Sequence, residues 1–416
     1  MRNDINKNYR PSGFLQFPDG FLWGASTSAY QVEGGIINDW SEWEMSDKRL
    51  NFLRKKGLNY QDFVAGKTCG SYNCYAEDAD LLKHLNCNAH RFGLEWARIE
   101  PVEGEFSAEA IQHYRHVLAA LKYNGIKTVV TIWHWTNPMW LVHEGGWSNK
   151  KVVGYYKRYA RFVAEELGDL VDYWVTLNEP TVHVLNGYVN GKFPPNKKNI
   201  FKAFQVLFNL IKAHKVAYSE IHEVLPKAQV SITHLGNNFD AARKWFLPEV
   251  ILAGLANFLA NGILMGKIKK HLDYIGLDYY FHNRMVFYPP FIRNKNKETT
   301  DMGWEIYPKG IYNVLKYLNR FKKPIIIMEN GLADAADSRR EKFILDHLFW
   351  THRAIEEGVD VRGYFHWSLV DNFEWAHGWV PKFGLCELDR RTLERRPRPS
   401  AWRYAEICRD NGFYIK

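Results

Sequence analysis

Eight short apolar segments, each followed by a stretch with helical periodicity, constrain the fold of this chain more than any other feature. They lie at residues 21–27, 88–96, 127–135, 172–180, 228–236, 273–280, 324–331 and 361–370. Residues 111–125 illustrate the intervening stretches, because their apolar side chains recur at helical spacing and Gly125 suits a helix C-terminus. Eight strand-then-helix units predict a (β/α)8 barrel with its active site at the C-terminal ends of the strands.

The rest of the chain agrees with one barrel rather than several domains. It has 416 residues, 46% of them hydrophobic, and no linker-like or low-complexity segment divides it. We therefore predict a single catalytic domain over residues 1–416. The long interval at 28–87 is expected to hold surface loops and additional helices.

Two of the predicted strands end in a carboxylate. The fourth ends in "TLNEP", with Asn178 and Glu179, and the seventh ends in "IMENG", with Glu329 and Asn330. Strands four and seven face each other across a barrel mouth, so both carboxylates meet one substrate. Cleavage of a glycosidic bond requires such a pair, one protonated and one ionised. The alternative, a structural salt bridge or cap at each strand end, is less favoured for two carboxylates that each stand beside an asparagine.

The remaining strand ends carry polar groups interleaved with flat aromatic rings. They are Arg91, His134, Trp135, Asp278, Tyr279, Tyr280, Trp367, Glu374 and Trp375. A sugar presents hydroxyls around its rim and C–H groups on its faces, so this mixture suits a sugar site. The alternative makes each aromatic a core residue and each polar group a satisfied hydrogen bonder, but the clustering at one end of the barrel favours a site.

Composition argues against several other classes. The net charge of +9 comes from 55 basic and 46 acidic residues spread along the chain, apart from a basic cluster at 390–400, and we predict no nucleic-acid partner. Only His134 and His234 lie near predicted strand ends, so we predict no metal. The chain has no Gly-rich strand-to-helix turn of the kind that binds nucleotides, and we predict no cofactor.

Cysteine usage and the N-terminus predict a cytoplasmic location. The five cysteines are an odd number without metal-ligand spacing, which suits a reducing compartment. Residues 1–13 are polar and lack the apolar region of a signal peptide.

Residues 246–266 approach the length of a membrane span. They contain Pro248, Glu249, Asn257 and Asn261, and the charged and amide groups would be costly in hydrocarbon. We predict a buried barrel helix and no stable membrane association, with a membrane or partner contact through this segment as the alternative.

The order of motifs resembles the family-1 glycoside hydrolases, the β-glucosidases and broad β-glycosidases, over nearly the full length. The matching stretches are "FPDGFLWGASTSAYQVEGG" (17–35), "HRFGLEWARIEP" (90–101), "VTIWHWTNPMWL" (130–141), "EGGW" (144–147), "TLNEP" (176–180), "TDMGWEIYPKGIY" (300–312), "IMENGLAD" (327–334) and "WSLVDNFEWAHGW" (367–379). The resemblance implies a retaining β-glycosidase that hydrolyses terminal non-reducing β-D-glucosyl, galactosyl or fucosyl residues of small β-glycosides or oligosaccharides.

The resemblance also assigns roles to residues. Glu329 would be the nucleophile and Glu179 the general acid/base of a double displacement. Arg91 and Tyr280 would position Glu329. The residues expected to bind substrate are Gln31, His134, Trp135, Asn178, Tyr280, Trp367, Glu374 and Trp375.

Physical chemistry agrees with these roles. Arg91 is expected to keep Glu329 ionised, and Glu179, which faces that charge in a partly apolar mouth, is expected to have a raised pKa. In a retaining enzyme the two carboxyl groups lie about 5 to 5.5 Å apart. Glu374 and Trp375 favour an unphosphorylated sugar, and Glu179 favours O-glycosides over thioglycosides.

Two departures from the family pattern produce further expectations. Asp278 stands where the family has Asn, and we expect it to alter the pH profile by sharing a proton or by bonding to Arg91. Residues 237–272 are fewer than the family has between strands five and six, so we expect a thin, open or mobile flank there.

Two alternatives use the same residues. One is a catalytically weak or silent sugar-binding barrel, and the other is an enzyme whose main activity is transglycosylation. The sequence leaves open the preference among glucose, galactose, fucose and mannose, the aglycone and the oligomeric state.

Overall fold

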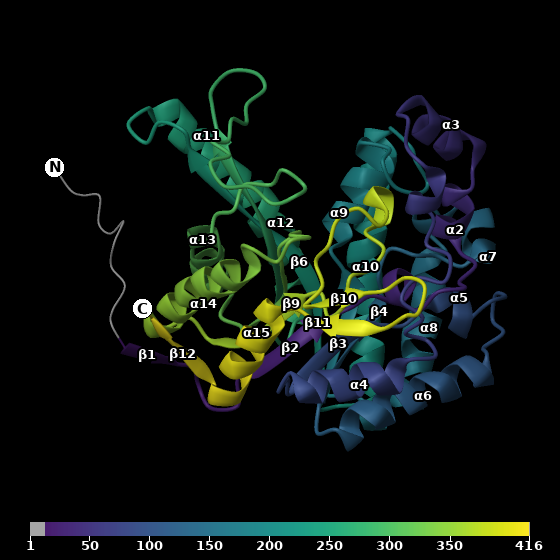
Figure 1. Cartoon of the computed structure of the whole chain (residues 1–416). Coiled ribbons are helices and arrows are strands. Elements are labelled where there is room, and N and C mark those ends of the chain that lie inside the picture. Colours follow the sequence, from purple (N-terminus) through teal and green to yellow (C-terminus); the bar gives the residue numbers. More distant parts are fainter. Residues whose placement is uncertain (1–12, 416) are drawn as a thin grey trace.

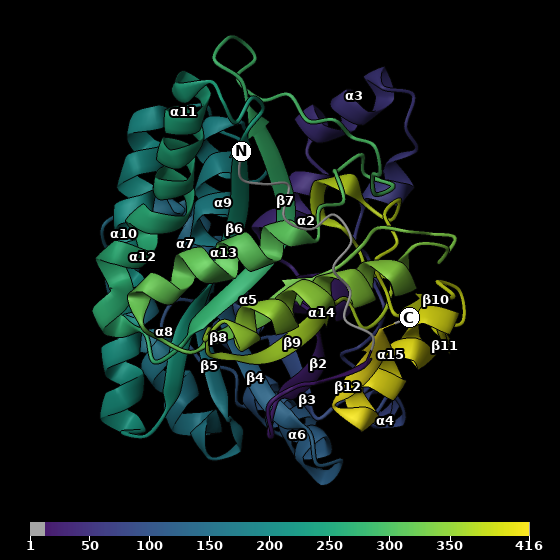
Figure 2. The ribbon, with the colours of Figure 1, turned by 90° about the vertical axis from the view of Figure 1, so that its left-hand side faces the viewer.

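Eight parallel strands close a barrel in the computed structural model, which describes residues 13–415 (Figures 1 and 2). In spatial order they are β2 (Leu22–Ser26), β3 (Ala89–Gly93), β4 (Lys127–Trp133), β5 (Tyr173–Asn178), β6 (Gln229–Ala241), β7 (Ile275–Met285), β8 (Ile325–Asn330) and β9 (Val361–Trp367). Every strand coincides with a predicted segment, and the barrel prediction is confirmed. Of the N-terminal stretch 1–13, all but Gly13 lies outside the described residues.

A helix or helix pair follows each strand. In strand order these are α4 (Tyr75–His84), α6 (Ala108–Tyr123), α8 (Val152–Leu167), α10 (Ile200–Val224), α11 (Leu247–Asn257) with α12 (Ile263–Ile268), α13 (Lys309–Leu318), α14 (Arg340–Glu356) and α15 (Pro399–Asp410). Helix α6 illustrates how the sequence marks the two ends of a helix. Ser107 caps its N-terminus by accepting a hydrogen bond from the Ala110 amide, and Gly125 just beyond its end has φ +74°.

Short elements fill the connections. The short helices are α1 (Ala29–Val32), α2 (Asp39–Glu44), α3 (Asp47–Lys55), α5 (Trp96–Ile99), α7 (Met139–His143) and α9 (Pro180–Val184). Single 3₁₀ or π turns are η1 (Tyr60–Phe63), η2 (Gly146–Ser148), η3 (Gly168–Leu170), η4 (Leu185–Val189), η5 (Phe258–Gly262), η6 (Lys269–His271), η7 (Asn319–Phe321) and η8 (Trp375–His377). Two antiparallel pairs, β1 (Gly13–Gln16) with β12 (Gly412–Ile415) and β10 (Cys386–Leu388) with β11 (Arg395–Pro397), lie outside the barrel. The extra helices expected within 28–87 are therefore present.

Strands β6 and β7 extend five residues beyond their predicted ends. They pair with each other from Asn237 with Phe281 to Ala241 with Met285, whereas β5 on the other side has already ended. Two side chains from the following helical run, Asn257 and Asn261, cover that free edge of β6 in place of a strand. Asn257 bonds to the Phe239 amide and carbonyl at 3.1 and 2.7 Å, and Asn261 bonds to the Asn237 amide and carbonyl at 3.0 and 2.8 Å. Backbone groups that would otherwise lack partners are satisfied in this way.

The prediction of a buried helix over 246–266 is wrong for α11. In the most apolar part of the helical run Leu247–His271, only 22% of residues are buried. By length and composition this run is long and apolar enough to cross a membrane. Helix α11 leans away from the barrel beside the long β6 strand (Figure 1), and only α12 returns to the core with Leu264, Met265 and Ile268. The shortened flank is thus helical, and it is open because its helix exposes an apolar side.

Candidate active site

The end of β8 does not continue the side-chain alternation of its beginning. Ile326 and Met328 point into the barrel interior, whereas Ile325 and Ile327 pack under the outer helices. Strict alternation would place Glu329 with the outer set. The register of β8 shifts against β7 at Leu277/Asp278 and against β9 between Ile327 and Asn330. Such irregularities redirect side chains, and Glu329 lies at the mouth.

Glu329 is held by two donors. The Arg91 guanidinium forms a buried ion pair with its Oε1, and the Tyr280 hydroxyl donates to Oε2 at 3.0 Å. Burial raises the pKa of Glu329, while Arg91 and Tyr280 act in the opposite direction. The carboxylate is thus a hydrogen-bond acceptor from both sides, which is the arrangement that stabilises its ionised form.

Arg91 is itself fixed by other strands. Its Nε donates to Thr131 Oγ1 on β4 at 3.0 Å, and its second terminal nitrogen donates to Asn178 Oδ1 on β5. The Thr233 hydroxyl of β6 donates to the same oxygen, and the Asn178 amide lies 2.9 Å from His134 Nε2. We did not single out Thr131 and Thr233 from the sequence. The sequence feature that could have identified them is a hydroxyl residue inside an otherwise apolar parallel strand.

Glu179 has different surroundings. It precedes α9, with Pro180 as the first helical residue and a left-handed backbone at φ +37°. Its Oε1 is buried and accepts no hydrogen bond from any described residue. Burial, followed by the negative charges of Asp278 and Glu329, raises its pKa well above the ordinary value. These surroundings favour the protonated form of the Glu179 carboxyl group.

Asp278 lies level with Glu329 in the β7–β8 register. Both of its oxygens are buried without a hydrogen-bond partner among the described residues. Burial and the Glu329 charge raise its pKa well above the ordinary value, with Arg91 opposing them. The donors of Arg91 go to Glu329, Asn178 and Thr131, so the alternative in which Asp278 bonds to Arg91 is wrong.

The other predicted residues line one side of the same mouth. Gln31 from α1 donates to Glu374 Oε2 at 3.3 Å and to the Phe373 carbonyl at 2.8 Å. The Trp375 ring centre lies 4.8 Å from that of Trp135 and 5.6 Å from that of His134. Burial and then the Glu329 charge raise the pKa of Glu374 to about 8, although hydrogen bonds from Trp367 and Gln31 act against this.

Three residues of this mouth have strained backbone conformations. Trp135, Glu179 and Trp375 have φ values of +73°, +37° and +49°. Left-handed conformations of side-chain-bearing residues cost roughly 1–3 kcal/mol each and persist only where the surrounding structure enforces them. Trp135 and Trp375 pack together in the aromatic cluster just described, and Glu179 is the carboxyl group that follows β5.

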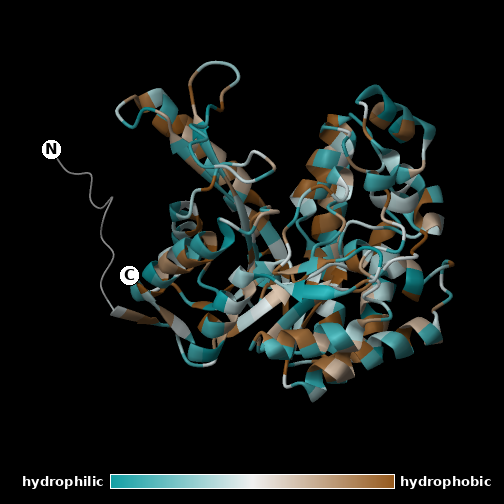
Figure 3. Ribbon diagram, in the orientation of Figure 1, coloured by the Kyte–Doolittle hydropathy of each residue, from teal (hydrophilic) through white to brown (hydrophobic). Residues whose placement is uncertain are grey.

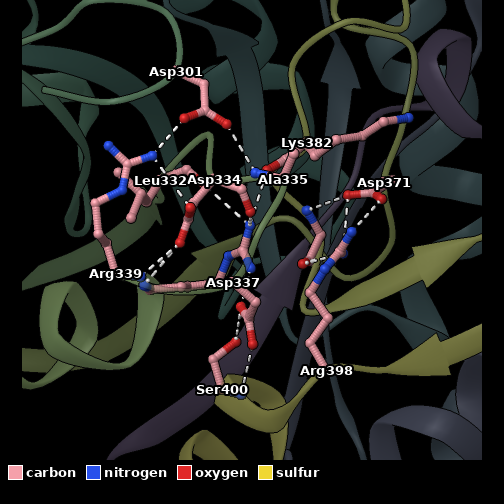
Figure 4. Close-up of polar contacts among 12 residues, drawn as sticks. Asp301, Leu332, Asp334, Ala335, Asp337, Arg339, Asp371, Lys382, Arg398 and Ser400 are labelled. Carbon is pink, nitrogen blue, oxygen red and sulfur yellow. Dashed lines mark hydrogen bonds and ion pairs between the residues drawn. The ribbon is translucent and has the colours of Figure 1, made fainter.

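The loops after β8 and β9 are fixed by a polar network behind the mouth (Figure 4). Arg398 makes a bidentate pair with Asp371 at 2.8 and 3.1 Å, and Asp371 also accepts from the Gly384 amide at 3.0 Å. Asp337 binds the Ser400 hydroxyl at 2.6 Å. Because Asp371 precedes Glu374 by three residues, this network holds the loop that carries Glu374.

Comparison with known proteins gives consistent matches. The model of the family described as Glycosyl hydrolase family 1 matches residues 15–244 and 264–413. "Beta-glucosidase A" of Thermotoga maritima is 31% identical over 95% of this chain and 98% of its own length. "Beta-galactosidase" of Sulfolobus acidocaldarius is 32% identical over 96% of each chain. The solved "beta-glycosidase from Pyrococcus horikoshii" is 36% identical, with a TM-score of 0.86 over 97% of each chain.

Proposed function

Because this chain belongs to glycosyl hydrolase family 1 and is a glycoside hydrolase, we propose that it removes terminal non-reducing β-D-glucosyl or β-D-galactosyl residues from small O-glycosides with retention of configuration. The observation that carries this proposal is the unequal environment of two carboxyl groups at one barrel mouth. Glu329 accepts hydrogen bonds from Arg91 and Tyr280, whereas Oε1 of Glu179 is buried without a donor.

In the first step, Glu329 attacks the anomeric carbon and forms a glycosyl ester. The bond to the leaving oxygen breaks as Glu179 transfers its proton to that oxygen, so no free alkoxide forms. The raised pKa of Glu179 supports this role because the group must be protonated at the start of the step.

In the second step, Glu179 is ionised and takes a proton from water. The resulting hydroxide equivalent attacks the anomeric carbon, the ester bond breaks, and Glu329 leaves as a carboxylate. The loss of charge from Glu329 in the intermediate removes one source of the raised Glu179 pKa, which prepares Glu179 to act as a base only after the leaving group has departed.

The sugar-binding roles follow from the same side of the mouth. We propose that Gln31, His134, Asn178 and Glu374 bind hydroxyls of the non-reducing sugar, with Trp135 and Trp375 beside them and Trp367 beneath the ring. The support is the contact of Gln31 with Glu374 and the close packing of His134, Trp135 and Trp375. This side of the mouth thus offers a sugar both hydrogen-bonding groups and aromatic faces.

Hydrolysis of a panel of nitrophenyl β-glycosides tests the proposal. The panel contains glucoside, galactoside, fucoside, mannoside and 6-phosphoglucoside. The wild type is expected to hydrolyse the glucoside or galactoside and Glu329→Ala to hydrolyse none. Absence of hydrolysis by the wild type, with sugar binding retained, would instead identify a sugar-binding barrel, and transfer to added sugar in preference to water would identify a transglycosylase.

A further inference from the structure

The helix that departs from the predicted burial forms a continuous exposed apolar surface. On α11 and directly beside its two ends, Trp245, Leu247, Ile251, Leu255 and Phe258 are 79%, 66%, 62%, 50% and 52% exposed. The loop after β7 continues this surface with Phe287, Tyr288, Phe291 and Ile292, all large and exposed. We call these nine residues the α11 surface. Brown, hydrophobic segments mark α11 in Figure 3.

The two parts of the α11 surface are in contact. The Phe246 and Phe287 ring centres lie 6.2 Å apart, and the Phe287 amide donates to Glu249 Oε1 at 3.4 Å. The Ala242 amide donates to the Met285 carbonyl at 3.0 Å. The loop after β7 is therefore packed against the N-terminal end of α11.

Positive charge surrounds this surface. Residues 242–259 and 286–298 contain five basic residues and two acidic residues, Glu249 and Glu298. Glu249 is buried and paired with Arg243 at 2.6 Å, so the other four basic residues are opposed by Glu298 alone. Lys244, Arg293, Lys295 and Lys297 are exposed and lie close in the chain to the apolar residues. An apolar patch with aromatic residues and a basic rim is complementary to an anionic lipid surface.

The helix cannot leave the barrel to span a bilayer. Asn257 and Asn261 hold the β6 edge, and the downstream residues Leu264, Met265 and Ile268 are buried in the core. Pairing of two copies through this surface would bring two sets of like charges together, which is unfavourable. Compared with a helix that spans the bilayer or a pairing of two copies, shallow contact with an anionic membrane agrees best with both the apolar residues and the charge.

The α11 surface lies on the same side of the molecule as the active-site mouth. Asp278 is level with Glu329, and β7 continues seven residues further to Met285, which is about 20 Å of strand. The family model leaves residues 245–263 unmatched, so all of α11 lies outside what the family model describes.

We propose that this enzyme binds anionic membrane surfaces through the α11 surface, with its active-site mouth on the side that faces the lipid. This contact is peripheral and reversible. It revises the expectation of no stable membrane association, and it accords with a cytoplasmic location because the inner leaflet carries the anionic lipids.

Co-sedimentation of the full chain with lipid vesicles tests this proposal. Vesicles of equimolar phosphatidylcholine and phosphatidylglycerol are compared with vesicles of phosphatidylcholine alone, at low and high salt. We expect strong binding to the anionic vesicles at low salt and much weaker binding in the other conditions.

Matched variants separate charge from apolar contact. Lys244→Gln/Lys295→Gln/Lys297→Gln is expected to weaken binding about 100-fold, and Trp245→Ser/Ile251→Ser/Leu255→Ser at least about 10-fold. The controls Lys83→Gln/Lys150→Gln/Lys227→Gln and Tyr123→Ser/Trp402→Ser replace exposed residues elsewhere and should bind like the wild type. Circular dichroism establishes that each variant is folded.

Three results would overturn the proposal. They are no binding of the wild type to anionic vesicles, equal binding by the α11-surface variants and their controls, and a wild-type dimer in light scattering that the apolar variant converts to a monomer. The last result would assign the surface to a second copy of the chain. None of these readouts depends on glycoside hydrolysis.

Discussion

A glutamate lies at the C-terminal end of both β5 and β8, Glu179 just after β5 and Glu329 as the last residue but one of β8, but the two carboxyl groups have different surroundings. Glu329 receives hydrogen bonds from Arg91 and Tyr280, whereas Oε1 of Glu179 is buried with no donor. Burial raises the pKa of both carboxyl groups. At Glu329, Arg91 and Tyr280 act against this increase, whereas at Glu179 the charges of Asp278 and Glu329 add to it. The neighbours thus favour the ionised form of Glu329 more than that of Glu179, although the side chains are identical.

The largest expected effect comes from removing the charged member of the pair. Glu329→Ala is expected to lower kcat by about 10⁵–10⁶-fold, as loss of a nucleophile does. Steady-state hydrolysis of nitrophenyl β-glucoside measures it, with Glu109→Ala, an exposed carboxylate on α6, as the control. A loss below 100-fold would show that Glu329 is not the nucleophile.

Removing the protonated member should have a smaller effect that depends on the leaving group. Glu179→Gln is expected to lower kcat/KM by about 10²–10⁴-fold for a substrate with a basic leaving group, because protonation then limits the rate. For a dinitrophenyl glycoside, whose leaving group needs no proton, the loss should be much smaller. Equal losses for the two substrates would contradict the acid role.

Removing Arg91 should make the two carboxyl groups more alike. Arg91→Met takes away the cation that lowers the pKa of Glu329. Since Glu329 must be ionised to attack, the acidic limb of the kcat/KM profile is expected to move to higher pH, with a loss of about 10²–10³-fold at the former optimum. A uniform loss without movement of that limb would indicate only a structural role.

The smallest expected change concerns Asp278. Its charge is one of the causes that raise the pKa of Glu179, so Asp278→Asn should let Glu179 lose its proton at lower pH. Because Glu179 must be protonated to act as an acid, the alkaline limb of the kcat/KM profile is expected to move to lower pH. An unchanged profile would exclude Asp278 from the proton balance of the site.

The barrel was predictable because parallel strands buried on both faces produce short apolar runs at regular intervals. The convergence of Glu179 and Glu329 followed from the fold, since strand ends meet at one mouth. The register shifts near Asp278 and Asn330, which redirect Glu329, have no signal in residue type. The roles of Thr131 and Thr233 depend on which strands are neighbours, and only the folded barrel shows this.

The exposure of α11 was not predictable for a related reason. Its apolar residues have the composition of a core helix, and burial depends on whether a second helix lies against them. In the structure, Asn257 and Asn261 hold α11 to an extended β6 edge instead of to the helical ring. A pattern of apolar residues indicates that burial of a segment would be favourable, but it does not show whether another element covers that segment.

Glu329 is expected to form a covalent bond to the sugar while Glu179 serves as acid and base. Incubation with dinitrophenyl 2-deoxy-2-fluoro-β-glucoside, followed by mass spectrometry of peptides, tests it directly. The fluorine slows hydrolysis of the intermediate by destabilising its positively charged transition state, so the ester accumulates. We expect one fluoroglucosyl group per chain, attached to Glu329 and absent from Glu329→Ala. A label on Glu179 or Asp278, or release of the α-anomer as first product from the unfluorinated substrate, would contradict it.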